Sequence, residues 1–362
     1  MRYFTLLFLS FFIFSFTSYG NVSSEEKSGE EEKPFDQMGM VMHHIADSHS
    51  WVVYSSEGED GHHRELVIPL PVIFIDNGAL HFFLSSRFNE SKSGVVESRG
   101  GYYLLTHNKI YKTDAEGRVN LDNDHHITND RVFDISFTRN VASMWISIAI
   151  IFAIFIPMAR RYRSGISAPK GVQSVFEPIV LFVRDDIVYT QIGKKNAHKY
   201  LPYLMTLFFF IWVNNLLGLV PFFPGGSNLT GNIAFVLVLT LFTFFITNFS
   251  GTKTYWKHIL MVPGIPGFVK PIMIPVEILS IFTKPFALMI RLFANITAGH
   301  MLILSLISMI FVYKSIYLAP PSVIVVVVMS ILELFVGLLQ AYIFTLLSAL
   351  FIGMAIQEDD HH

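Results

Sequence analysis

Cysteine is absent from this chain of 362 residues. Disulfides, thiolate metal sites, iron–sulfur clusters and thiol nucleophiles are therefore all excluded. Charged side chains are also scarce, since they make up 15% of the sequence, whereas a soluble domain usually carries about a quarter. The net charge of −2 leaves no basic excess that would indicate a nucleic-acid partner. The lack of cysteine excludes a disulfide scaffold. The scarcity of charged residues indicates that the chain as a whole does not have the surface of an ordinary soluble protein.

Two families of catalytic motif are missing as well. The sequence contains no GxxxxGK[ST] loop, so we do not expect the chain to hydrolyse ATP by itself or to act as an enzyme. No HExxH motif or comparable ligand spacing occurs, although nine of the 14 histidines lie between His43 and His126. We interpret these histidines as solvated surface, with a metal site as the alternative, and we expect no cofactor. They include the adjacent pairs His43/His44, His62/His63 and His125/His126.

What the chain does contain is apolar sequence, with 52% hydrophobic residues and 35 phenylalanines. The long apolar runs begin after about residue 139, which indicates lipid as the main solvent there. We predict three spans of ordinary length and two longer helical segments. They are Ser143–Met158, Tyr200–Val220, Asn232–Phe249, Ile272–Tyr313 and Ser322–Ile356.

Between the first two spans, Gly171–Gly193 mixes apolar residues with four charged ones. This segment is too charged to span a membrane, and it is typical of a helix that lies at the interface. The predicted fold class is therefore an all-α polytopic membrane protein. It has about five transmembrane helices and an interfacial helix, and its last two helices form a long tilted hairpin.

The first 139 residues differ in character. Residues 1–20 have a basic start, an apolar stretch and small residues near Gly20, a pattern that predicts a signal peptide. An uncleaved signal anchor is the alternative. Residues 21–139 are predicted to form an external region, β-rich or irregular, with short runs at Leu66–Asp76, Ala79–Ser86 and Tyr102–Tyr111. Residues 140–362 are the predicted membrane domain.

Basic residues predict the orientation. Eight Lys and Arg residues follow the first span and three follow the third, whereas the other two links contain only Lys314. With five spans, this asymmetry places the N-terminal region in the periplasm and the C-terminus in the cytoplasm. A bacterial inner membrane fits both this topology and the signal peptide.

Ionisable residues interrupt the fourth apolar segment. Glu277, Lys284, Arg291 and Asn295 fall within about 40° of one another on a helix, and His300 points to about the opposite side. Ionisable groups at membrane depth cost about 3 kcal/mol each on insertion scales, so they should face protein or water rather than lipid. As one helix this segment would extend roughly 60 Å against a hydrocarbon core of about 30 Å, which requires a steep tilt or a bend.

The last segment carries Glu333 and Gln340 on one face. In an antiparallel hairpin, the residue numbers of any two facing residues add up to nearly the same total. The pairs Arg291/Gln340 and His300/Glu333 give nearly the same total, which corresponds to a turn near residue 316. The two levels are about 13 Å apart along the helices. We therefore predict polar pairs at two depths, with the His300 level nearer the external turn.

Three strings resemble a known family: IRLFANITAGHM, LELFVGLLQAYIFTLLSALFI and WVNNLLGLVPFFPG. They are similar to the motifs of subunit a in the F0 sector of ATP synthases, over about Ser136 to Ile356. The resemblance implies the static half of a proton channel beside the c-ring. The implied partners are that ring, the subunit b peripheral stalk and the rest of the complex. The long N-terminal region departs from the family's usual short external tail.

The resemblance also implies roles for individual residues. Arg291 matches the essential arginine of the family and Gln340 its neighbouring glutamine. His300 and Glu333 match a polar pair near the external half-channel. Further polar positions along the two access paths are Asn214, Asn215, Glu277 and Asn295.

Several alternatives stay open at this point. His300 and Glu333 could relay protons or hold a water chain, and Glu277 with Lys284 could be a purely structural pair. Na⁺ in place of H⁺ is possible, because the ion-binding site belongs largely to the ring. A secondary transporter is the main rival class, yet no internal repeat is visible. A plain membrane anchor would need no register between polar residues across a hairpin.

Overall fold

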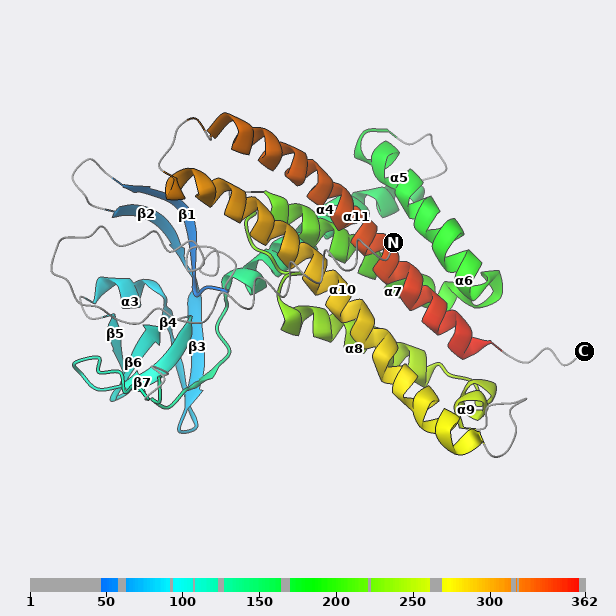
Figure 1. The fold of residues 1–362 in the computed structure, drawn as a ribbon, viewed down its shortest axis with the longest axis horizontal. Coiled ribbons are helices and arrows are strands. Elements are labelled where there is room, and N and C mark those ends of the chain that lie inside the picture. The colour runs from blue at the N-terminus through cyan, green and yellow to red at the C-terminus, as the bar shows by residue number, and fades with distance from the viewer. Residues whose placement is uncertain are drawn as a thin grey trace, which may run out of the picture. The chain divides into compact units, whose positions relative to one another are not determined.

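The protein is described here from a computed structural model (Figure 1). It describes residues 47–57, 63–91, 94–106, 108–122, 127–163, 170–220, 223–260, 269–313, 317 and 319–357. The predicted signal peptide, the pairs His43/His44 and His125/His126, and also His62 and His107 lie outside these residues. His49 and His81 are only 2% and 3% exposed, so the interpretation of these histidines as solvated surface is wrong for these two, which hydrogen-bond to Asp134 and Ser98.

The N-terminal part of the described chain is built from short strands in three small antiparallel sheets. The sheet orders are β1-β2, β4-β3-β8 and β5-β6-β7. A short helix, α3 (Ser86–Glu90), follows β4. The strands are β1 (Ser50–Glu57), β2 (His63–Pro69), β3 (Pro71–Asp76), β4 (Ala79–Leu84), β5 (Val95–Ser98), β6 (Gly101–Thr106), β7 (Lys109–Thr113) and β8 (Phe133–Asp134).

Prolines and turn residues explain where these strands break. The run Leu66–Asp76 was predicted as one unit, but it contributes to two strands because Pro69 and Pro71 cannot donate to a continuous ladder. Asn77 and Gly78 both have positive φ, 49° and 78°, which gives the two-residue turn between β3 and β4. The run Tyr102–Tyr111 is likewise a hairpin of β6 and β7.

Apolar side chains and one carboxylate join two of the sheets. Val72, Phe74 and Phe83 of the β4-β3-β8 sheet pack against Tyr103 and Ile110 of the β5-β6-β7 sheet. Asp76 closes this core, because it accepts a hydrogen bond from the Tyr103 hydroxyl at 2.9 Å and pairs with Lys112. Burial raises the pKa of Asp76, but the bonds from Lys112 and Tyr103 outweigh it and hold this pKa below its ordinary value.

Replacing Asp76 with Asn is expected to destabilise this region by about 1–3 kcal/mol at neutral pH, because a charge-assisted link between two sheets is lost. The pKa of Asp76 is lower in the folded than in the unfolded chain. Its stabilising effect is therefore complete above the unfolded value, about 3.9, and is lost as pH falls through the folded value. Hydrogen exchange of the β6 amides in the full chain, corrected for intrinsic rates, measures this loss.

The matched control is Asp114→Asn. Asp114 pairs with Arg118 on the surface, where both side chains are exposed, and it accepts a hydrogen bond from the Arg118 N–H that asparagine can also accept, so loss of its charge should cost little. If the β6 amides are equally protected from exchange in the Asp76→Asn and Asp114→Asn variants at pH 7, then Asp76 does not stabilise the contact between the two sheets.

Helices form the rest of the described chain (Figure 1). Four are long and apolar enough to cross a membrane, or five if α8 and α9, bent by 100°, count as one span. This confirms the predicted polytopic helical membrane fold for the part that the structure describes. The helices are α4 (Arg139–Arg163), α5 (Val172–Phe182), the π-helical η1 (Val183–Tyr189), α6 (Thr190–Ile192), α7 (Lys194–Leu219), α8 (Ile233–Phe249), α9 (Lys253–Leu260), α10 (Lys270–Val312) and α11 (Ala319–Ile356).

Local signals account for several helix ends. Gly193 has φ of 80° and separates α6 from α7, so the predicted interfacial helix Gly171–Gly193 corresponds to α5, η1 and α6. The Asn232 side chain caps α8 by accepting a hydrogen bond from the Ala234 N–H at 3.0 Å. Helix α9 was not predicted, because its residues were interpreted as a basic link.

Helix α11 lies at the centre of the helical core. It packs against α7, α10 and α8, and also against α6. A Cβ atom on Gly353 would overlap the carbonyl oxygen of Gln191, so only glycine allows this approach to α6. The core is apolar, with Leu204, Ile211 and Ile352 fully buried. The long hairpin of α10 and α11 is therefore held by the remaining helices along one side.

Candidate functional site

The first polar contact across the hairpin joins α10 to α11. His300 Nε2 lies 3.6 Å from Glu333 Oε1, with side chains only 18% and 5% exposed. Gly299 permits this approach, because a Cβ there would lie 2.8 Å from the same oxygen. The predicted facing of His300 and Glu333 is thus confirmed as a contact, while its role stays a prediction.

The Glu333 carboxylate is unusual in its surroundings. Both of its oxygens are buried, and neither accepts a hydrogen bond from any described residue. A buried carboxylate that accepts no hydrogen bond is costly. A polar site of this kind therefore favours water or a transferable proton as the missing partner.

Helix α7 packs against this part of the hairpin and carries two buried asparagines. Gly218 of α7 faces His300, since a Cβ there would lie 3.5 Å from its Nε2 atom. Asn215 donates to the Gly337 carbonyl of α11 at 2.8 Å and accepts from the Thr230 hydroxyl at 2.8 Å. Asn214 is 1% exposed, and its Oδ1 atom has no partner among the described residues. This polar cluster lies where α7, α10 and α11 meet.

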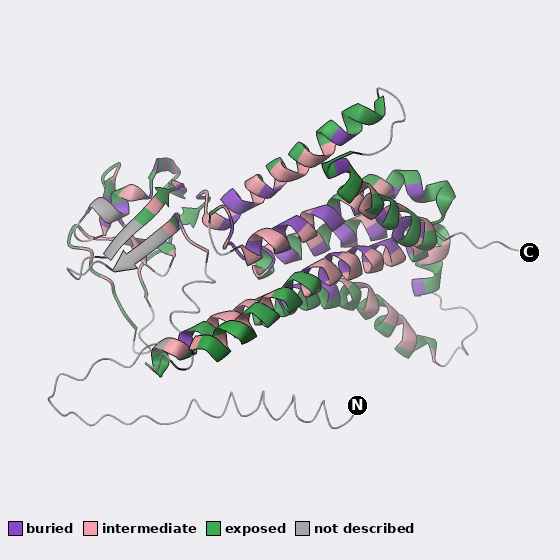
Figure 2. Cartoon of the chain, turned by 90° about the horizontal axis from the view of Figure 1, so that it is seen from above, coloured by how far each residue is buried: buried purple, intermediate pink, exposed green. Residues whose placement is uncertain are grey.

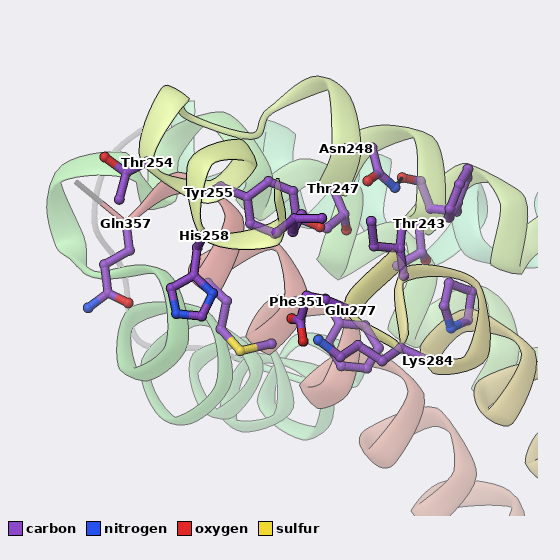
Figure 3. Close-up of a pocket in the computed structure, with 15 residues that line it drawn as sticks. Thr243, Thr247, Asn248, Thr254, Tyr255, His258, Glu277, Lys284, Phe351 and Gln357 are labelled. Carbon is purple, nitrogen blue, oxygen red and sulfur yellow. Dashed lines mark hydrogen bonds between the residues drawn. The ribbon is translucent and has the colours of Figure 1, made fainter. Parts of the chain in front are cut away.

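A cavity of about 310 Å³ lies near the opposite ends of the hairpin helices. Figure 3 shows the side chains around it, which come from α8, α9, α10 and α11. Glu277 and Lys284 of α10 and His258 of α9 contribute its ionisable groups. Two further polar atoms in its wall, Thr247 Oγ1 and Asn248 Oδ1, are buried without a partner among the described residues. The cavity therefore offers water several polar partners in a wall that is otherwise largely apolar.

Glu277 and Lys284 line this cavity together but do not form an ion pair in the described part of the chain. The Lys284 ammonium lies 6.0 Å from the ring centre of Phe351 on α11. This arrangement favours a hydrated site over the alternative of a structural pair between the two residues.

Arg291 and Asn295 are exposed on α10, whereas Glu277 and His300 on either side are half-buried. Exposed residues recur along the long helices (Figure 2). Gln340 is 6% exposed on α11. Among the described residues no hydrogen bond joins Arg291 to Gln340, so their predicted facing stays a prediction, whereas the His300 level is confirmed as a contact. Arg291 lies on a face of α10 that the described chain leaves exposed.

The polar groups follow a simple order along α10. Arg291 lies 14 residues after Glu277 and nine before His300, which is about 21 Å and about 14 Å along the axis. The two polar regions are thus separated by exposed positions of α10 that carry two cations, Lys284 at the edge of the cavity and Arg291 between the two regions. Sequence periodicity placed these groups on α10, but only the fold assigns one region to the cavity and the other to α7.

Two parts of the site escaped sequence reasoning. Ser227 donates to Asn140 Oδ1 at 2.6 Å, which links residues 87 positions apart. The wall residues from α9 were missed because that helix was read as a link. Neither part produces a periodic pattern in the sequence, since each depends on how segments that are far apart in the chain pack against one another. No group of three His, Asp or Glu residues gathers as a possible metal site within the described chain.

The fold and these groups define a polytopic helical membrane protein with ionisable residues along a long hairpin. The family described as ATP synthase A chain matches residues 141–353, and the chain belongs to this family. The resemblance read from the sequence is therefore confirmed. A second match, described only as a domain of unknown function, covers residues 40–135.

Similar curated proteins support the same family. ATP synthase subunit a 2 of Chlorobaculum tepidum is 47% identical over 284 residues, which cover 75% of this chain and 77% of the relative. ATP synthase subunit a of Chloroherpeton thalassium is 44% identical over 242 residues, or 63% and 69% of the two chains. ATP synthase subunit a of Myxococcus xanthus is 40% identical over 239 residues, or 64% and 77%.

Proposed function

We propose that this chain is the stator subunit of the F0 proton channel in a rotary ATP synthase of a bacterial inner membrane. It provides two aqueous half-channels and presents Arg291 to the c-ring, so that proton flow drives rotation and ATP synthesis elsewhere in the complex. The chain itself is not catalytic. Its other proposed protein partner is the subunit b peripheral stalk.

The observation that carries this proposal is the order of polar groups along α10. The cavity at Glu277 and the polar cluster at His300 lie at opposite ends, with exposed Arg291 between them. A continuous pore would let protons cross the membrane without driving rotation of the ring. Two separate openings instead force a proton to travel on the ring between them.

Arg291 acts as the fixed charge at this crossing point. Its guanidinium stays protonated even in a poor solvent, so it attracts a carboxylate on a passing ring subunit and favours loss of its proton. The same cation repels hydronium and opposes a direct leak between the two openings. A bare arginine facing lipid would be very costly, which supports a protein partner on this face.

The two openings take different residues. His300 and Glu333, with Asn214 and Asn215, line the external path, where hydration is favoured over a strict relay because Glu333 has no described hydrogen-bond partner. Glu277 lines the path on the other side, and Asn295 and Gln340 flank Arg291. Each proton gains about 2.3 kcal/mol per 100 mV of membrane potential.

The proposed topology follows the basic links. Residues 1–20 form the signal peptide, residues 21–139 lie in the periplasm, and residues 140–362 form the membrane domain with a cytoplasmic C-terminus. This orientation puts the His300 end of α10 at the periplasmic side and the Glu277 cavity at the cytoplasmic side.

Cross-linking tests whether the open face of α10 meets the ring. The chain has no cysteine, so Asn295→Cys and Leu302→Cys each give one attachment point for a benzophenone maleimide, and at a spacing of seven residues both lie on one face of α10. We expect light-dependent adducts with the ring subunit from both positions. Phe152→Cys on α4 is the matched control, because Phe152 is 58% exposed and Leu302 is 51% exposed. Adducts from Phe152, or none from α10, would contradict a ring contact at this face.

A further inference from the structure

The β4-β3-β8 sheet of the N-terminal region has a second apolar face. Leu80, Phe82 and Leu84 alternate along β4 with buried His81 and Phe83, so they point away from the core. An antiparallel sheet with one solvated face should carry polar residues at such positions. These leucines and Phe82 are instead 46–66% exposed.

Strand pairing extends this face across the sheet. Ile75 pairs with Leu80 on one side and with Phe133 on the other, so all three side chains lie in one row. Ile135, two residues beyond Phe133, falls on the same side. The outer apolar face, as we call it, carries no charged residue at these positions; exposed Arg131, two residues before Phe133, lies over the Tyr111 ring, 5.4 Å from its centre. Its members are Ile75, Leu80, Phe82, Leu84, Phe133 and Ile135, each at least 37% exposed.

The outer apolar face is tied to the start of a membrane span without a slack linker. After β8 the backbone keeps bonding to β3, through Ile135 N–H to the Ile73 carbonyl and Phe137 N–H to the Pro71 carbonyl. Helix α4 then begins at Arg139, only four residues after Ile135. Four extended residues cover at most about 14 Å.

Further contacts fix the strands to the first turns of α4. Arg139 N–H donates to the Ser48 carbonyl at 2.8 Å, and Asn140 N–H to Asp47 Oδ1 at 3.1 Å. Trp51 packs with Ala142 of α4 in a small apolar cluster. Trp145, one turn further on, is 55% exposed, as expected for an aromatic residue at the membrane–water interface. The sheet is therefore held at the level where α4 enters the bilayer.

We propose that the outer apolar face rests on the lipid surface and inserts Phe82 and Phe133 into the headgroup region. Contiguous exposed apolar patches mark interaction sites, and the nearest apolar phase to a sheet fastened to α4 is the bilayer. The absence of charge on this face predicts binding to zwitterionic lipid, with no requirement for anionic headgroups. The inference goes beyond the proton path and does not depend on it.

Nitroxide accessibility tests this docking in the intact ATP synthase complex, reconstituted into phosphatidylcholine nanodiscs with the other subunits free of cysteine. Single labels at Phe82→Cys and Phe133→Cys are expected to show a severalfold higher ratio of oxygen to nickel-chelate accessibility than a label at Lys109→Cys. Lys109 is exposed on β7 of the same region. Leu80→Cys, on the same face, replaces either reporter if that variant fails to assemble.

Two results would overturn the proposal. Ratios at the outer apolar face equal to that at Lys109 would place the face in water. Low accessibility to both oxygen and the nickel chelate would mean that another protein covers it. Proton pumping by each labelled complex is measured alongside, so that a failed proton path and a failed lipid contact are told apart.

Discussion

Replacing Arg291 with alanine is expected to abolish ATP-driven proton pumping in inverted vesicles while leaving the complex assembled. The ring carboxylate would lose the cation that draws it into the charged form, and protons would no longer be exchanged at the crossing point. Because Arg291 is exposed and bonds to no buried partner in the described chain, its removal should not unfold α10. A tenfold loss of rate corresponds to about 1.4 kcal/mol, and the expected loss is larger.

Arg160→Ala provides the control for this experiment. Arg160 is an exposed cation in the last turn of α4, remote in sequence from the hairpin. Pumping by this variant should match the wild type, and subunit content should be equal in all three complexes. Unchanged pumping after Arg291→Ala, with the complex intact, would make Arg291 a structural residue and would remove the basis of the proposed mechanism.

The second large effect is expected at Glu333. Glu333→Leu should lower passive proton conductance through F0 by an order of magnitude or more, because an apolar side chain would dry a site where two carboxylate oxygens now accept no hydrogen bond from the described residues. Glu333→Gln keeps the size and the hydrogen-bonding capacity of the side chain. If water carries the proton, conductance of the Gln variant should stay within a few-fold of the wild type.

The comparison of these two variants separates hydration from relay. Equal loss in Glu333→Gln and Glu333→Leu would show that a titrating carboxylate is required and would reject hydration. Conductance is measured in vesicles stripped of the catalytic sector, so that the step at the ring does not depend on ATP. His300→Gln is the companion variant, because His300 Nε2 lies 3.6 Å from the Glu333 carboxylate.

Much of the helical fold follows from local sequence. Apolar runs longer than the bilayer is thick become helices, because lipid offers no other partner for backbone N–H and C=O groups. The predicted segment Ile272–Tyr313 differs from α10 by only a few residues at its ends, and Asn232–Phe249 differs from α8 by its capping residue. The β region was less predictable, since strands depend on partners that sequence does not reveal.

The sequence by itself also determined the facing of His300 and Glu333. The register of two antiparallel helices follows from the residue numbers, because the rise per residue is the same in both helices. It determined the stripe of Glu277, Lys284 and Arg291 for the same reason. These properties belong to single helices or to one hairpin, and no other part of the chain can change them.

Only the tertiary structure decided which of these polar groups are buried and which are open. Asn215 reaches the Gly337 carbonyl across 122 positions, and four helices enclose the cavity at Glu277. Such contacts depend on crossing angles and on the path of connections, which are set by packing over the whole core. For the same reason, the exposure of Arg291 could not be read from its own segment, because it depends on where the other helices stop.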